Sequence, residues 1–307
     1  MLKYAVKRVF MLIPVLIGIT LMVYLILSLT PVDPVKIVLG VGEFTAEDYE
    51  MTKEWLGLND PLLVRYGKYL ANVARGDFGT SWYNGYNVGT EFARRFPYSL
   101  KIGIYANIIS IIIGIPFGII AGVRHNKASD YIATVVSLLL VSAPSFWVGM
   151  LGQLYLAVRL NLLPVAGSDT FKHYILPSFV GAGAMLASNM RTTRTWLVDV
   201  IRSDYVRTAR AKGAHEFTVI VKHALRNALL PVITTLGMNF AMILGAVTII
   251  ETVFAIPGAS SFLISACRVG DVPIVMGCIV VVAVFVGAIN LVIDLIYALV
   301  DPRVSYG

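Results

Sequence analysis

Long runs of apolar residues alternate with short charged segments along this chain. A helix needs about 20 mainly apolar residues to cross a bilayer, so each long run is a candidate membrane span. Six spans are predicted, at residues 9–29, 102–123, 131–158, 174–190, 228–253 and 275–300. The first run follows a basic segment and no A-x-A-type cleavage site follows it, so a retained helix is expected rather than a cleaved signal.

Small residues and one proline give some of these spans further features. Gly, Ala and Ser dominate residues 174–190, which predicts a helix enclosed by its neighbours. Ala143-Pro144-Ser145 interrupts the third run and predicts a kink. The second run carries small-residue faces suited to close helix packing, formed by Gly103, Gly114, Gly118 and Gly122.

Residues 31–97 are the main polar region between the apolar runs. Thr45 and Asp48 form a capping-box pattern, which predicts a helix over 45–56. A second helix is predicted over 61–74, and its apolar face would carry Leu62, Tyr66, Tyr69 and Leu70. A turn is predicted at 76–79. The region is expected to be a small extracytoplasmic module.

Composition supports an integral membrane protein. Of the 307 residues, 57% are hydrophobic and only 14% are charged, with a mean hydropathy of +0.77. A soluble domain has about 25% charged residues. The net charge of +7 resides mostly in short loops beside apolar runs, so it is interpreted as a topology signal and no nucleic acid is expected as a partner.

The basic residues predict the orientation in the bilayer. Residues 191–226 carry eight basic and three acidic side chains, and residues 124–127 form a short basic loop. Loops rich in Lys and Arg stay in the cytoplasm. Six spans with both termini in the cytoplasm satisfy this bias in every short loop.

One polar stretch within the 191–226 loop predicts a docking helix. Ser203 or Asp204 is available as N-cap and Gly213 as the stop. A second helix follows, with Phe217, Ile220, Val221, Ala224 and Leu225 at helical spacing on one side. A short basic helix held beside the bilayer suits contact with a soluble partner. The candidate contact residues are Asp204, Tyr205, Val206, Arg207, Thr208, Ala209, Arg210, Ala211, Lys212 and Gly213.

Motifs for catalysis are absent from the sequence. There is no GxxxxGK[ST] phosphate loop, no GxSxG and no histidine cluster, and His215-Glu216 lacks the second histidine of HExxH. Polar residues inside the predicted spans are candidates for a solute path, although interhelical hydrogen bonding is the simpler interpretation of any single one. They include Asn107, Gln153, Asn189, Asn239 and Glu251, with Asn290 and Asp294 near the end of the chain.

Residues 204–231 resemble the EAA loop of ATP-binding cassette (ABC) importer permeases. That pattern is EAA, three residues, Gly, nine residues and I-x-LP. Gly213 matches, Arg207-Thr208-Ala209 takes the EAA position, and Leu230-Pro231 comes five residues late. The ending HALRNALLP resembles the dipeptide, oligopeptide and nickel branch of these permeases. Further stretches resemble the same branch, namely residues 4–14, 29–31, 58–61, 75–79, 95–97, 250–254 and 294–303, whereas Ala259-Ser260-Ser261 departs from it.

The resemblance implies an all-α membrane protein with six transmembrane helices and a type I ABC importer permease core. The implied domains are an N-terminal helix at 1–30, an extracytoplasmic module at 31–97 and a core at 98–303. The chain would be a transport subunit of a prokaryotic inner membrane, with no cofactor of its own. Its implied partners are a second, paralogous permease, two ATPase subunits carrying ATP and Mg, and an extracytoplasmic solute-binding protein.

The sequence is compatible with more than one solute and with other classes of membrane protein. Peptide is the first choice of solute, and nickel chelates, glutathione and sugars are the alternatives within the same importer class. An ion-coupled secondary carrier would need no ATPase, and the docking helix argues against it. A membrane enzyme lacks a catalytic constellation in this sequence.

Overall fold

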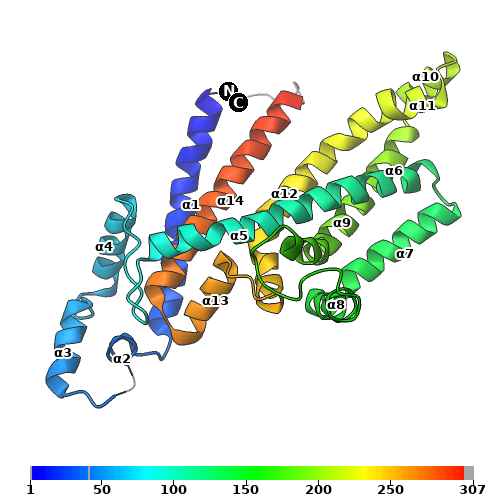
Figure 1. Cartoon of the computed structure of the whole chain (residues 1–307). Coiled ribbons are helices and arrows are strands. Elements are labelled where there is room, and N and C mark those ends of the chain that lie inside the picture. The colour runs from blue at the N-terminus through cyan, green and yellow to red at the C-terminus, as the bar shows by residue number, and fades with distance from the viewer. Residues whose placement is uncertain (1, 41, 301–307) are drawn as a thin grey trace. The chain divides into compact units, whose positions relative to one another are not determined.

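The computed structural model describes residues 2–40 and 42–300 and is helical, with no strand among those residues (Figure 1). The described residues divide into two compact units, one of residues 99–256 and 288–300, the other of residues 2–98 and 257–287. The helices are α1 (Leu2–Leu29), α2 (Pro34–Leu39), α3 (Ala46–Trp55), α4 (Leu62–Ala74), α5 (Val88–Ile109), α6 (Ile115–Val123), α7 (Ala128–Ser142), α8 (Ser145–Gly152), α9 (Lys172–Ile201), α10 (Asp204–Ala211), α11 (Glu216–Thr218), α12 (Arg226–Val253), α13 (Ala259–Val269) and α14 (Val272–Val300). Three π-helical segments join some of them, namely η1 (Ser110–Gly114), η2 (Gln153–Arg159) and η3 (Val219–Leu225).

In the unit of residues 2–98 and 257–287, α4 packs against α1 through tyrosines. Tyr24, Tyr66 and Met276 form a buried cluster, and the Tyr66 hydroxyl lies 2.8 Å from the Thr20 hydroxyl. The predicted α4 face is confirmed, because Leu62, Tyr69 and Leu70 pack on the same cluster. The predicted capping box of α3 is present, since Thr45 Oγ1 accepts from the Asp48 N–H at 3.1 Å.

A buried carboxylate holds the loop after α4 in the same unit. Asp271 is fully buried between α13 and α14 and accepts from Ser81 Oγ at 2.5 Å and from the Trp82 N–H at 3.2 Å. A buried carboxylate is costly unless hydrogen bonds satisfy it. Asp271 therefore fixes the position of Trp82.

In the other unit, α9 is the central helix, in contact with α6, α7 and α12 (Figure 1). Gly114 at the end of η1 and Gly118 and Gly122 of α6 all face α9. A Cβ on Gly118 would lie 2.6 Å from the Met190 carbonyl oxygen, and one on Gly114 would lie 2.8 Å from that of Leu186. The predicted close packing of this glycine face is confirmed.

The predicted kink is also present. Helices α7 and α8 meet at an angle of 96° across Ala143 and Pro144. The ring of Pro144 cannot continue a helix, because it lacks an N–H. The bend lets α7, α8, α9 and α12 surround a mainly apolar cavity of about 690 Å³.

Each of the six predicted spans lies in helical segments, although the third is the bent α7–α8 pair, and the all-α membrane fold class is confirmed. By length and apolar composition three described segments qualify as spans, Phe10–Leu29, Val88–Val123 and Val272–Ile293, and the bent α7–α8 pair makes a fourth when counted as one. Helices α9 and α12 have 30 and 28 residues. At about 1.5 Å per residue, both are long enough to cross a bilayer.

Some element boundaries differ from the sequence prediction. Helix α9 continues 11 residues past the predicted end at Met190, because no glycine or proline interrupts residues 191–201. Helices α2 and α13 were not predicted, and the Ala259-Ser260-Ser261 departure forms the first turn of α13. Residues 301–307 and the side chain of Asp294 lie outside the described residues.

Candidate functional site

The predicted docking helix is present as α10. Ser203 occupies the N-cap position, but its hydroxyl donates back to the Val200 carbonyl at 2.6 Å and leaves the helix without a side-chain cap. Gly213 has a φ of +80° and its N–H donates to the Arg210 carbonyl at 2.9 Å. The glycine stop is therefore in place, in a backbone conformation that other residues rarely adopt.

Helix α10 is anchored to its own chain through one face. Val206 is fully buried in a cluster with Leu197, Val219, Ala224 and Ala228, and Ala209 packs against the same cluster. The expectation that Val206 packs against a partner is wrong, because no part of this side chain reaches the surface. Tyr205 is 45% exposed. It is the aromatic side chain of α10 that a partner can reach.

The outward face of α10 is polar and basic. Arg207, Thr208, Lys212 and Arg210 are exposed, and Arg210 makes two hydrogen bonds to Glu216, at 3.0 and 2.6 Å. The Arg210 guanidinium lowers the pKa of Glu216. Arg210 is thus held by its own chain, whereas Arg207 has only a distant 3.9 Å contact with Asp204 among the ion pairs of the described chain.

The helix after α10 presents a different face from the predicted one. Phe217 is 69% exposed and Val221 is exposed, while Val219 and Ala224 are buried. The reason is η3, in which hydrogen bonds run from i to i+5 and widen the turn. Residues 219 and 224, five apart, therefore share a face, which a 3.6-residue period does not indicate.

Three helices share a chain of polar side chains in their interior. Asn189 on α9 donates to Ser110 Oγ at 3.0 Å and accepts from Asn239 on α12 at 3.0 Å. Ser110 in turn donates to the Asn107 carbonyl at 2.7 Å. The structure thus joins two of the five predicted path residues, Asn189 and Asn239, by an interhelical hydrogen bond, whereas Asn107 takes part only through its backbone carbonyl. Asn239 is half-buried, while Asn189 and the Asn107 side chain are buried.

The other two path candidates lie elsewhere in the same unit. Gln153 Nε2 donates to the Val165 carbonyl at 2.8 Å and to the Val253 carbonyl at 3.0 Å, which joins η2 to the end of α12. Glu251 is fully buried and accepts from Ser99 Oγ at 2.5 Å. Interhelical hydrogen bonding, the simpler interpretation of such a residue, is what Glu251 shows here.

A charged cluster was missed by the sequence analysis. Asp130, in the first turn of α7, is 2% exposed and forms an ion pair with Arg194 of α9. Its Oδ2 accepts from Arg194 Nη2 and from the Asn126 N–H, both at 2.9 Å, and lies 3.1 Å from His125 Nδ1. Asp130 resembles an ordinary acidic residue at a helix start, so no sequence signal pointed to this pair.

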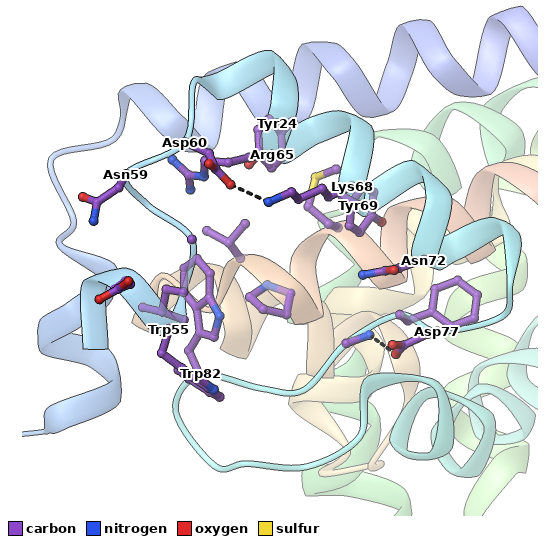
Figure 2. Close-up of a pocket in the computed structure, with 18 residues that line it drawn as sticks. Tyr24, Trp55, Asn59, Asp60, Arg65, Lys68, Tyr69, Asn72, Asp77 and Trp82 are labelled. Atoms are coloured by element: carbon purple, nitrogen blue, oxygen red, sulfur yellow. Dashed lines mark hydrogen bonds and ion pairs between the residues drawn. The ribbon is translucent and has the colours of Figure 1, made fainter. Parts of the chain in front are cut away.

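A pocket of about 620 Å³ opens beside α4 in the unit of residues 2–98 and 257–287. Figure 2 shows Trp55 and Trp82 together on one side, and Lys68, Tyr69 and Asn72 of α4 on another. Lys68 forms an ion pair with Asp60 at 2.6 Å on the rim. Trp55 is 71% exposed. Exposed tryptophan beside a polar rim is typical of a surface that contacts a partner.

Two family models together match the whole chain apart from residues 104–113 and 307. Residues 114–306 match the model described as binding-protein-dependent transport system inner membrane component. Residues 1–103 match the corresponding N-terminal model.

Full-length relatives agree with these matches. The glutathione transport system permease protein GsiC of Escherichia coli strain K12 is 37% identical over 306 residues, with all of both chains covered. The oligopeptide transport system permease protein AppB of Bacillus subtilis strain 168 is 38% identical over 317 residues, again with all of both chains covered. The chain therefore belongs to the family of binding-protein-dependent inner-membrane transport components, the permease subunits of ABC importers.

Proposed function

We propose that α10 is the attachment point for a separate ATPase subunit. The observation that carries this proposal is the division of α10 into a buried anchor, Val206, and an outward face of Tyr205 and basic side chains. A rigidly anchored helix transmits displacement, whereas a mobile loop absorbs it. Arg207 and Lys212 are suited to pair with acidic residues on the rim of the ATPase groove.

In this proposal, two ATPase subunits bind ATP and Mg and close on nucleotide. Their closure displaces α10 because the helix makes different contacts with the open and closed ATPases, and only such a difference lets ATP bias the membrane helices. The path then opens outward, where a solute-binding protein delivers solute. A second, paralogous permease supplies the other half of the path, and both termini of this chain lie in the cytoplasm.

Tyr205→Ala is expected to weaken ATPase attachment. Aromatic anchors in an interface cost about 2 kcal/mol or more when truncated, so co-purification of the ATPases with the tagged chain should fall by more than tenfold. Trp55→Ala is the control, because it removes an exposed aromatic side chain outside residues 191–226. Normal ATPase recovery with Tyr205→Ala would defeat the assignment of α10.

We propose a short peptide as the solute. The two relatives are named for glutathione, itself a tripeptide, and for oligopeptides. Nickel chelates and sugars remain the alternatives. Mass spectrometry of the solute that co-purifies with the partner binding protein decides between them, and recovery of a metal chelate or a sugar would overturn the peptide assignment.

Asn239 is the proposed solute contact among the five path candidates. Its side chain is half-buried and makes one hydrogen bond to Asn189. We assign Gln153, Asn189 and Glu251 to holding helices together, because the side chain of each is hydrogen-bonded to another segment. Asn107 is buried, which leaves its side chain little exposed to a solute. Asn239→Ala is expected to change the KM for uptake more than the amount of folded chain.

The module at 31–97 is proposed to receive the binding protein at the Trp55–Trp82 pocket. Trp55→Ala should reduce stimulation of ATP hydrolysis by the loaded binding protein by about tenfold, because an exposed tryptophan that becomes buried in an interface is a frequent hot spot. ATPase co-purification should stay unchanged. Undiminished stimulation at saturating and subsaturating binding protein would exclude this pocket from the interface.

A further inference from the structure

The ion pair between Asp130 and Arg194 is a two-point contact, whereas a single contact would be enough to stabilise the start of α7. Arg194 approaches the carboxylate through both Nε and Nη2, so the pair is bidentate. The Asn126 N–H and His125 Nδ1 complete the surroundings of the same carboxylate. A buried charge pair is retained at little net gain in stability, because desolvation offsets much of its attraction. The main effect of this pair is therefore to fix the position of α7 relative to α9.

The two partners belong to elements with different roles. Arg194 lies on the last two turns of α9, seven residues before the helix ends and about 10 Å along its axis. Only Arg202 and Ser203 separate α9 from α10. Asp130 lies in the first turn of α7, whose far end forms the kink beside the 690 Å³ cavity.

Apolar contacts alone would fix the two helices less firmly. Ala121, Ala133 and Met190 form the small buried cluster between α6, α7 and α9, with Leu186 against it. Small apolar side chains can slide past one another at modest cost, whereas a bidentate ion pair allows one relative position. A displacement of the end of α9 is thus passed to α7 through the ion pair.

We propose that the Asp130–Arg194 pair is a positioning link that carries movement of α10, through α9, into the α7–α8 pair. This inference rests on the proposed attachment of the ATPase at α10. Loss of the link leaves the ATPases bound and active but separates ATP hydrolysis from movement of the helices around the cavity. The pair thus determines how much solute is transported per ATP.

The test uses the complete importer in proteoliposomes, with solute uptake and ATP hydrolysis measured in the same preparation. The variant is the double substitution Asp130→Asn with Arg194→Gln, which leaves no unpaired buried charge. We expect normal ATPase co-purification and a ratio of solute to ATP reduced by about tenfold, within the 5–150-fold range of typical couplings. Arg94→Gln is the control, because Arg94 is a 78% exposed arginine outside these elements.

If the double variant transports as much solute per ATP as the wild type, the proposed link is wrong and the ion pair has only a structural role. If the double variant does not accumulate, Arg194→Lys is measured instead, since it keeps the charge but loses the bidentate geometry. An unchanged ratio of solute to ATP in this variant would likewise overturn the link. Each single substitution should lower the ratio as much as the double one, because the pair acts as a unit. Failure of the proposed function has a different signature, namely normal ATPase co-purification with Tyr205→Ala.

Discussion

Replacing Gly213 by valine is expected to lower ATP-driven uptake by about tenfold. Gly213 has a φ of +80°, and no atom would lie within 4 Å of a Cβ built there. The expected loss therefore comes from the backbone conformation at residue 213 and not from steric crowding. A non-glycine residue in the left-handed region costs about 1–2 kcal/mol, and a β-branched side chain is the least suited to it. The turn after α10 would rearrange, and ATPase co-purification would fall with uptake.

Gly213→Asn is the matched control for this prediction. Asparagine is larger than glycine and polar, yet it tolerates the left-handed region. Uptake should stay within about threefold of the wild type, because the cost in backbone energy is small. Equal uptake by the valine and asparagine variants would show that the turn geometry is unimportant.

Gly118→Leu is expected to have the largest effect on folding. A Cβ at this position would lie 2.6 Å from the Met190 carbonyl oxygen and 2.7 Å from Thr193 Cβ, so the backbone of α9 would have to move. Overpacking in a tight core costs about 1–3 kcal/mol, and a backbone obstacle places this case at the upper end. The amount of folded chain in detergent and its thermal stability should both fall sharply.

Gly18→Leu is the matched control, because it changes helix propensity as Gly118→Leu does but introduces no close contact. Gly18 lies within α1 with no atom within 4 Å of a built Cβ. Leucine is the better helix former at either position, by somewhat less than about 1 kcal/mol. Only a close approach of α9 distinguishes Gly118. Thermal stability reduced equally by both substitutions would contradict the glycine-face account.

Local sequence patterns were sufficient wherever neighbours along the chain determine the structure. The capping box of Thr45 and Asp48, the α4 face around Tyr66 and the stop at Gly213 each depend on residues within one or two turns. The kink at Pro144 depends on a missing N–H. These features follow from covalent geometry and helix periodicity, so the sequence suffices to predict them.

Features that depend on distant residues or on an altered helical period were missed. Asp130 and Arg194 are 64 residues apart, and neither stands out in its own segment. Val206 was assigned to a partner because its burial depends on Leu197 and Val219 from other elements. The π-helical turn at η3 changed the exposed face after α10. Tertiary packing, and not propensity, decided each of these cases.

In the proposed function, this chain moves solute only when ATP is hydrolysed on subunits attached at α10. The direct measurement is peptide uptake into liposomes by the chain alone and by the chain reconstituted with its second permease, ATPases and binding protein. We predict uptake only by the complete assembly with ATP inside the compartment that the ATPases face. Uptake by the isolated chain down a proton or sodium gradient would contradict the account.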